Sequence, residues 1–329
     1  MKRSGLLSRP LALTAVALGV SAGPVFAQAA RAPSGPIEIT VPSSAGSTPD
    51  VLMRRMGKIL NEQGIVKNPI VVVNRPGGAW IVGMNYVLGR SGSETDTLSI
   101  AEPVISTPIA QGQPTAYDRM TPLGIFVQTQ LIVVAQPNHK ANNLADLMKI
   151  AKESPRVVKM SGANPASTDA QVAGLLQKAT GTQLTYIPHD GGGAAQATFL
   201  GGNTDMITLT IDEALPLIQA KKGKALAILN ETRRPEPELK DIPTAKEQGI
   251  DVVWGQIFGI AGAPQLDPTV VAWWDERIAQ LVQHPEWKAT LASNFLGGEY
   301  MNSQQSKAYL AKMHEGRLAV LRQLGQAKM

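Results

Sequence analysis

The segment Ile39–Asp50 joins the end of an apolar strand to the start of a helix through a loop of small residues. Ser47 or Thr48 is suited to cap this helix, and Pro49 is suited to its first turn. Asp50 stands three residues after Ser47, which is the spacing of a capping box. Small side chains leave the loop N–H groups approachable, and a helix N-terminus stabilises an anion by about 0.3–1 kcal/mol. The segment therefore predicts an anion-binding loop.

The same arrangement returns at Val157–Asp169, in the other half of the chain. Two such loops predict two α/β domains that face each other across a ligand; the alternative is that both are ordinary strand-to-helix turns that bind nothing. Asp50 and Asp169 would either cap their helices or contact donor groups of the ligand. The candidate ligand-binding residues of the loops are Ser43, Ser44, Ala45, Gly46, Ser47, Thr48 and Asp50 in the first, and Asn164, Ala166, Ser167, Thr168 and Asp169 in the second.

The length of 329 residues is sufficient for two domains of ordinary size. A hydrophobic content of 43% agrees with a globular protein that has well-packed cores. The chain has no cysteine, which excludes disulfides, thiolate metal sites and cysteine nucleophiles.

The N-terminus has the pattern of a cleaved signal peptide, predicted to span residues 1–27. An apolar run, Leu11–Val20, is shorter than the roughly 20 residues that span a bilayer. Val25 and Ala27 then place small residues at the −3 and −1 positions of a signal-peptidase site. The mature chain would begin near Gln28 in the periplasm, and the alternative is a retained anchor. The basic residues of this segment are Lys2, Arg3 and Arg9.

Cleavage would remove three of the 31 basic residues and leave 28 against 26 acidic residues, so the formal charge falls from +5 to +2. The chain also lacks a run of Lys and Arg interleaved with aromatic residues. Nucleic acid is therefore not an expected partner.

Strands and helices alternate along the chain in the order that is typical of doubly wound sheets. The unbroken apolar run Ile70–Val73 fits a parallel strand buried on both faces. The other strands are expected at 37–41, 98–101, 131–135, 157–160, 184–187, 205–209, 225–229 and 254–261. Helices are expected at about 50–63, 80–89, 144–152, 169–179, 193–200, 213–221, 268–282, 286–293 and 303–324.

Motifs of catalytic or metal chemistry are weak. The G-x-S-x-G match at 19–23 lies in the signal peptide, without the strand and helix that a nucleophile elbow needs. The glycines after His189 are better interpreted as a helix entry than as an esterase oxyanion loop. The four histidines lie outside metal-binding spacings, and no metal or cofactor is expected. The pair Asp212–Glu213 is expected to begin a helix rather than to form a glycosidase pair.

Several motifs, in their order along the chain, resemble the substrate-binding proteins of tripartite tricarboxylate transporters, the Bug family. The turn Val73–Gly78 is the most specific of them. The others are Pro42–Asp50 with Arg54, Leu200–Met206, Ala214–Pro216, Asp241–Thr244 with Glu247 and Gly249, and Trp254–Gly255 through Ala263–Pro264. The resemblance covers essentially the whole mature chain.

The resemblance implies a two-lobed periplasmic binding protein fold of the α/β class, in which each lobe is a doubly wound sheet flanked by helices and the ligand lies in the cleft. Residues 28–136 would form the first lobe, 137–255 the second, and 256–329 would return to the first. The family's ligand is typically a carboxylate that loop amides, hydroxyls and waters hold. Such hydrogen bonds contribute about 1.5–3 kcal/mol each.

Three departures from the family pattern concern the ligand. Trp80 follows the turn in place of a small residue, where it either stacks on an aromatic ligand or fills space, and filling space is favoured. His189 and Asp190 replace a Tyr-Lys pair. Losing a Lys and gaining an Asp argues against a multiply charged anion and favours one carboxylate with a polar or cationic group, if these side chains face the cleft.

The signal peptide, the two loops and the family resemblance together predict a monomeric periplasmic receptor. It would capture a small organic carboxylate by hinge closure and deliver it to membrane permease subunits. A receptor that senses the ligand for a membrane partner would have the same cleft. An exported α/β hydrolase with His189 or Asp190 as acid or base is the third hypothesis, and it lacks a credible nucleophile.

Overall fold

The computed structural model describes residues 29–165, 167–189 and 191–328. The predicted signal peptide thus lies outside the described residues. In the described part of the chain, no helix is both long and apolar enough to cross a membrane.

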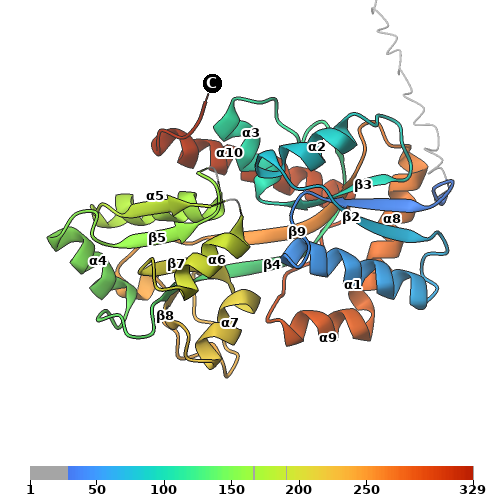
Figure 1. Ribbon diagram of the computed structural model, residues 1–329. Coiled ribbons are helices and arrows are strands. Elements are labelled where there is room, and N and C mark those ends of the chain that lie inside the picture. The colour runs from blue at the N-terminus through green and yellow to red at the C-terminus, as the bar shows by residue number, and fades with distance from the viewer. Residues whose placement is uncertain (1–28, 166, 190, 329) are drawn as a thin grey trace, which may run out of the picture.

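Two α/β lobes lie side by side, and two strands cross from one to the other (Figure 1). The first lobe contains β1 (Ile37–Val41), α1 (Thr48–Glu62), β2 (Ile70–Asn74), α2 (Ile81–Leu88), β3 (Asp96–Ala101), α3 (Pro103–Gln111), α8 (Pro268–Gln283), α9 (Pro285–Ser293) and α10 (Ser303–Gln323). The second lobe contains α4 (Leu144–Glu153), β5 (Lys159–Gly162), α5 (Thr168–Thr180), β6 (Thr185–Pro188), α6 (Gly192–Leu200), β7 (Met206–Thr210), α7 (Ile211–Gln219) and β8 (Lys224–Ile228).

The crossing strands are β4 (Thr121–Ala135) and β9 (Gly255–Gly262). They join both lobes into one nine-stranded sheet with the order β2-β1-β3-β9-β4-β7-β5-β6, and β8 pairs with β4 beside this path. In the first lobe, β1, β2 and β3 are parallel, while β9 is antiparallel to both β3 and β4. β4 and β9 therefore carry the sheet from one lobe to the other.

Helices cover both faces of most of the sheet, which explains the near-continuous apolar runs of the inner strands. The expected burial of β2 on both faces is wrong, because β2 is an edge strand of half-buried or exposed residues and Val71 is 52% exposed. In the first lobe, α1, α8 and α9 pack one face around the fully buried Trp274 and Trp287. The other face packs against α2, α3 and α10. Two further clusters cover the two faces in the second lobe.

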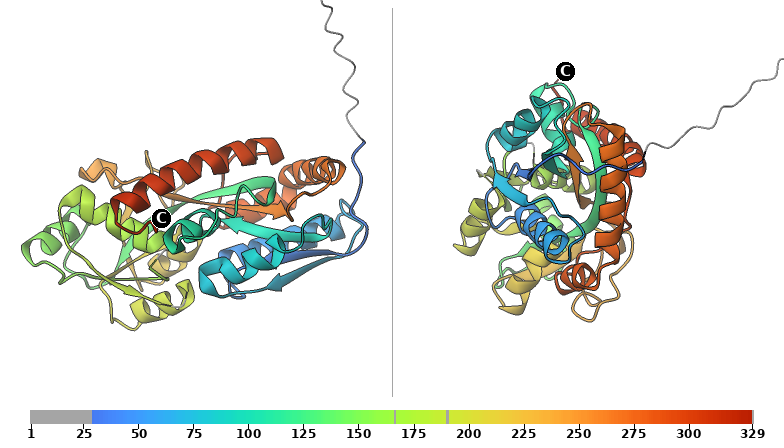
Figure 2. Two further views of the ribbon diagram at one scale, coloured as in Figure 1. Left: turned by 90° about the horizontal axis from the view of Figure 1, so that it is seen from above. Right: turned by 90° about the vertical axis from the view of Figure 1, so that its right-hand side faces the viewer.

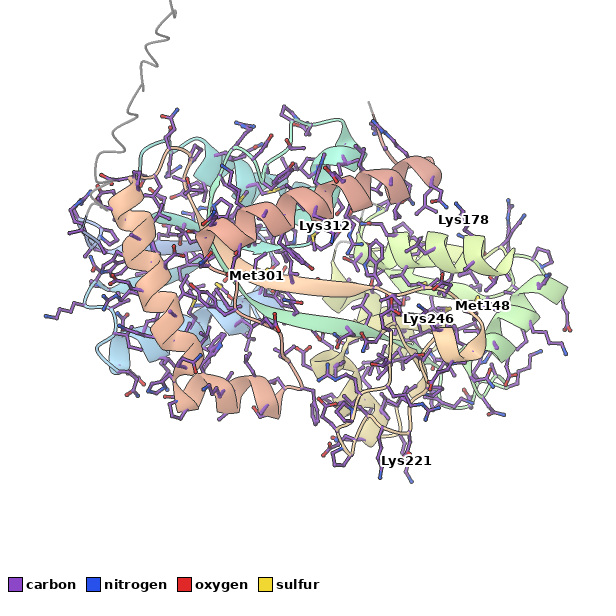
Figure 3. All side chains as sticks on the ribbon, turned by 180° about the vertical axis from the view of Figure 1, so that it is seen from behind. Met148, Lys178, Lys221, Lys246, Met301 and Lys312 are labelled. Carbon is purple, nitrogen blue, oxygen red and sulfur yellow. The ribbon has the colours of Figure 1, made fainter. Side chains whose placement is uncertain are left out.

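The pairing of β4 with β9 is irregular near the start of β4, where the register shifts twice. The N–H of Ile125 there donates to the carbonyl of Met301, just before α10, at 3.1 Å. Met301 is labelled in Figure 3. The hydroxyl of Ser306, in α10, accepts a second hydrogen bond from the same Ile125 N–H, with an N···O distance of 2.9 Å. These contacts attach α10 to the crossing strands, and Figure 2 shows α10 running alongside them.

The expected elements are confirmed to within a few residues, and two were missed. The sequence interpretation placed a strand only at 131–135, whereas β4 begins ten residues earlier at Thr121. It also left out α3, in which Pro108 stands inside the helix. Proline removes an N–H donor and normally argues against a helix interior, so only tertiary packing reveals this helix.

Candidate functional site

The first small-residue loop lies between β1 and α1, where its hydroxyls bond to the loop itself. Ser47 Oγ lies 2.7 Å from Ser43 Oγ and donates to the carbonyl of Ser44 at 2.8 Å. Ser47 occupies the N-cap position as expected, but its side chain makes no capping hydrogen bond. The expected capping box is therefore wrong: Asp50 accepts from the N–H of Gly46 at 2.9 Å instead of from Ser47. Ser44, Ala45 and Gly46 are exposed.

Asp50 ties this loop to the end of β2. Its Oδ1 accepts from Arg54 Nε at 3.0 Å and from Asn74 Nδ2 at 2.9 Å, and Asn74 also donates to the carbonyl of Ser43 at 3.0 Å. Burial opposes the ionisation of Asp50, but the hydrogen bonds from Arg54, Gly46 and Asn74 outweigh it and hold its pKa below the ordinary value. Asp50 thus orients the first loop through an ionised carboxylate.

Asp50→Asn is expected to destabilise the protein by about 1–3 kcal/mol at pH 7, because the new amide would direct a donor at Gly46 N–H or at Arg54. The folded-state pKa is depressed, so the stabilisation by Asp50 is complete above the unfolded value near 3.8 and disappears as the pH falls below it. Urea unfolding of both proteins from pH 7 downward measures the difference. Glu62→Gln, at the exposed end of the same helix, is the control, and an equal loss in both variants would contradict the assigned role.

The turn after β2 has an unusual backbone. Gly77 and Gly78 have φ values of 129° and 57°, and Ala79 and Trp80 follow at 54° and 83°. A positive φ is rare outside glycine, and it costs about 1–3 kcal/mol at each such residue. Trp80 is half-buried and packs against the apolar clusters on both faces of the first lobe. These contacts agree with the space-filling interpretation of Trp80.

The second small-residue loop lies between β5 and α5, with Ser167 at the N-cap. Ser167 Oγ accepts from the N–H of Ala170 at 3.3 Å, and it lies 3.0 Å from the hydroxyl of Tyr186. Tyr186 in turn donates to the carbonyl of Ala163 at 2.8 Å, and the N–H of Ser167 donates to the carbonyl of Asn164 at 2.9 Å. This loop is therefore fixed by its own hydrogen bonds. Ala166 and Asp190 lie outside the described residues.

Asp169 binds the second loop from within α5. It accepts from the N–H of Ala163 at 3.0 Å and from Thr208 Oγ1, on β7, at 2.7 Å. Burial raises the pKa of Asp169, because it disfavours the charged form more than these hydrogen bonds favour it. Gly162 makes the arrangement possible, since a Cβ at this position would stand 2.5 Å from Asp169 Cβ.

His189, at the end of β6, is half-buried and its N–H donates to the carbonyl of Gly162 at 3.0 Å. Its Nε2 is buried and has no hydrogen-bond partner among the described residues. His189 therefore lies beside the strand that leads into the second loop.

Glu102 connects the lobes, and the sequence interpretation did not include it. The residue follows β3 and is fully buried. Its carboxylate accepts from Thr168 Oγ1 at 3.3 Å and from Gln171 Nε2 at 3.3 Å, both on α5 of the second lobe. Arg317 of α10 forms an ion pair with Glu102 at 3.2 Å, and its guanidinium carbon lies 3.3 Å from the ring centre of Trp254. The only sequence signal was one acid in an otherwise uncharged stretch, 97–117.

A second contact between the lobes joins the N-termini of α1 and α7. Thr48 Oγ1 lies 3.2 Å from Asp212 Oδ2 and 3.4 Å from Glu213 Oε1. The prediction that Asp212 and Glu213 stand at a helix start is confirmed, since α7 begins at Ile211. The surrounding protein and the charge of Asp212 raise the pKa of Glu213 to about 7, and burial also raises the pKa of Asp212.

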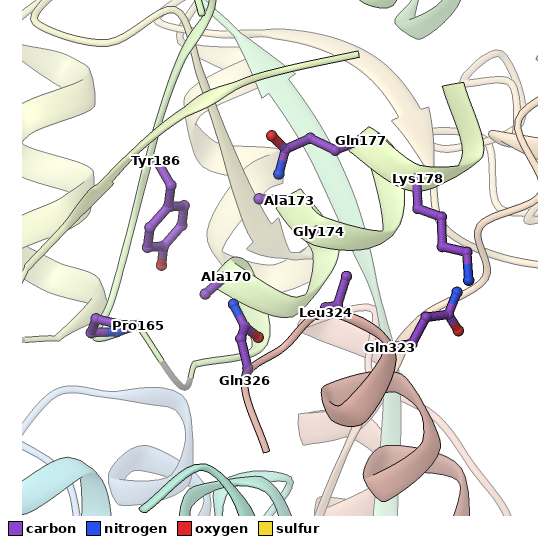
Figure 4. A pocket seen from close by; sticks show the side chains of 10 residues that line it. All are labelled: Pro165, Ala170, Ala173, Gly174, Gln177, Lys178, Tyr186, Gln323, Leu324 and Gln326. Atoms are coloured by element: carbon purple, nitrogen blue, oxygen red, sulfur yellow. The ribbon is translucent and has the colours of Figure 1, made fainter. Parts of the chain in front are cut away.

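Two hollows lie outside the set of predicted ligand residues. One of about 460 Å³ lies between α5 and the last residues of the described chain, where Tyr186 and Leu324 help to line it (Figure 4). The other, of about 210 Å³, lies where Trp254 and Arg317 meet the crossing strands. The structure therefore brings the two predicted loops to the lobe boundary through Thr48 and Thr168. Of the two hollows, the first borders the second loop at Pro165, and neither is lined by residues of the first loop.

The chain matches the family model described as "Tripartite tricarboxylate transporter family receptor" over residues 53–325. It is 24% identical to Protein BugT of Bordetella pertussis, over 89% of this chain and 90% of that protein. Among solved structures, a protein of R. palustris with adipate is 20% identical with a TM-score of 0.81, covering 90% of this chain and 99% of that one. MatC of Rhodopseudomonas palustris with bound malate is 18% identical with a TM-score of 0.77, covering 89% and 99%.

The family match spans most of the chain, and the two-lobed fold is shared with solved members of the same kind of receptor. The chain therefore belongs to the receptor family of the tripartite tricarboxylate transporters.

Proposed function

We propose that this protein is a periplasmic receptor that captures a small organic carboxylate between its lobes and delivers it to the membrane subunits of a tripartite transporter. The observation that supports the proposal is the pair of small-residue loops, one from each lobe, each of which leads into a helix whose first residue contacts the other lobe. Thr48 begins α1 and Thr168 begins α5, and each contacts the opposite lobe. Helix N-termini favour anions, and loop N–H groups can hydrogen-bond a carboxylate.

The ligands of structural relatives support a small organic carboxylate as the ligand class. MatC was solved with malate and the R. palustris protein with adipate, and both are small dicarboxylates. The hinge would be β4 and β9, with lobe boundaries near 136 and 255. The protein would act as a monomer, and residues 1–27 would direct its export.

Two other functions remain as hypotheses. A sensing role would use the same cleft and a different membrane partner. An exported hydrolase would need a nucleophile near His189, and turnover of a carboxylic ester that His189→Ala abolishes would establish it.

Thermal unfolding of the mature protein with a panel of aliphatic, aromatic and amino carboxylates tests the proposal. A ligand at 100 times its dissociation constant should stabilise the protein by about 2.7 kcal/mol. That corresponds to several degrees, at roughly 2–4 °C per kcal/mol for a chain of this size. Protein that has been unfolded and refolded to remove any retained ligand is the control. No shift with any acid would contradict the proposal.

A further inference from the structure

The buried carboxylate of Glu102 bonds to both lobes, and it does so through each of its two oxygens. Oε2 accepts from Ser106 Oγ, on α3 of the first lobe, at 2.8 Å and from Thr168 Oγ1, on α5 of the second lobe, at 3.3 Å. Oε1 lies 3.2 Å from Arg317 Nε, on α10, and accepts from Gln171 Nε2, on α5, at 3.3 Å. Each oxygen therefore has one partner on α5 and one partner on a helix of the first lobe.

The partners outside α5 hold the carboxylate in one orientation. Glu102 is the N-cap residue of α3 and Ser106 lies one turn later, so their contact does not depend on how the lobes are arranged. Arg317 is held where β9 begins, because its guanidinium carbon lies 3.3 Å from the ring centre of Trp254 and its Nη2 donates to the carbonyl of Gly255 at 3.4 Å. Glu102 thus presents both oxygens to α5 from a fixed position.

The partners on α5 belong to the helix start into which the second small-residue loop leads. Thr168 is the first residue of α5 and follows the N-cap Ser167, while Gln171 lies one turn later and is fully buried. A movement of α5 away from α3 would take one partner from each oxygen of Glu102. Because a buried carboxylate that loses hydrogen-bond donors is costly, these two bonds favour the arrangement of the lobes seen in this structure.

We propose that Glu102 is a positioning residue, which stabilises the closed arrangement of the lobes by accepting hydrogen bonds from Thr168 and Gln171. It would thereby hold the second loop in its ligand-binding position. This inference rests on the proposed function and describes how the same cleft is regulated. Only the closed fraction of the molecules would bind the ligand with full affinity, so the observed Kd rises as that fraction falls.

The test measures the arrangement of the lobes without ligand. The chain has no cysteine, so Lys58→Cys on α1 and Gln219→Cys at the end of α7 carry two spin labels at defined and exposed positions. The starts of α1 and α7 are in contact through Thr48, so opening of the lobes separates these helices. Pulsed electron paramagnetic resonance then gives the distribution of distances between the labels.

In the labelled protein, the double substitution Thr168→Val with Gln171→Leu is expected to shift this distribution to longer distances. Affinity for the acid that gives the largest thermal shift in the panel should weaken about tenfold, since hydrogen bonds to a charged group are lost from the closed state alone. Calorimetry measures that change. Thr168→Ser retains the hydroxyl and should keep the distances of the unaltered protein.

Ser106→Ala is the matched control, because it removes a hydroxyl donor from the same carboxylate but from within the first lobe. It should lower the unfolding temperature, as the double variant does, and leave the label distances and the affinity within twofold of those of the unaltered protein. Circular dichroism checks that every variant is folded.

An unchanged distance distribution in the double variant would overturn the inference and leave the carboxylate receptor standing. An equal shift in Ser106→Ala would also overturn it, because the effect would then not come from the bonds to α5. Absence of binding by the unaltered protein to every acid of the panel would overturn the proposed function, and with it the link between Glu102 and the ligand.

Discussion

Phe in place of Ser167 is expected to weaken ligand binding by at least about 100-fold, which corresponds to about 2.7 kcal/mol. Ser167 caps α5, is only 8% exposed, and stands one residue before the Thr168 contact with the first lobe. A large ring there would fill the second loop and move the helix start. Loss of the cap itself would cost about 0.5–2 kcal/mol of stability. Calorimetry with the ligand found in the acid panel measures the change.

Ser47→Phe tests the first loop in the same way, and it is the safer variant because Ser47 is half-buried and makes no capping bond. Gln304→Phe, at an exposed position in the first turn of α10, is the control and should bind normally. Folding is checked by circular dichroism. If folded Ser47 and Ser167 variants bind as well as the control, the two loops do not line the ligand.

Gly259→Ala is expected to destabilise the protein by at least about 3 kcal/mol, at the upper end of what overpacking usually costs. Gly259 is paired with Ile100 on one side and Ile125 on the other, in the centre of β9. A Cβ there would lie only 2.2 Å from the carbonyl oxygen of Gly124, and 3.0 Å from Ile125 Cα. Backbone atoms of a paired strand cannot move aside without breaking the sheet, so the pairing of β9 with both β3 and β4 is affected.

Thermal unfolding measures this loss as a drop of roughly 6–12 °C, at about 2–4 °C per kcal/mol. Gly316→Ala is the matched control, because Gly316 lies within α10 and a Cβ there meets nothing within 4 Å. That substitution should instead stabilise the protein by about 0.8–1 kcal/mol, the difference in helix propensity. Equal unfolding temperatures for Gly259→Ala and the unaltered protein would mean that β9 and β4 do not pack this closely.

Much of the fold could be predicted because local signals agree with it. The starts of helices α1 and α8 could be predicted, because a proline follows a small or acidic residue at Thr48–Pro49 and at Asp267–Pro268. Apolar runs such as that of β2 identify strands without reference to the rest of the chain. The first half of β4 gave no such signal, since Pro122 and Gly124 interrupt it. The strand exists because β9 supplies partners along most of its length.

Only part of the candidate site could be predicted from the sequence. The two loops were found because small residues before a helix are a local pattern. Glu102 and Arg317 were not, because 215 positions separate two side chains that become an ion pair only when α10 packs beside α3 and α5. For the same reason, Asp212 and Glu213 could be placed at a helix start but not at the boundary between the lobes.

The α/β class, the two small-residue loops, the helix starts and the family could be predicted from sequence, because each depends on residues close together in the chain or on their order. Which acids face each other could be learned only from the folded chain. Thr48 contacts Asp212 and Glu213 because β4 and β9 connect the two lobes and so place α1 next to α7. The charge balance of a cleft depends on distances through space between distant segments, and no local pattern encodes those distances.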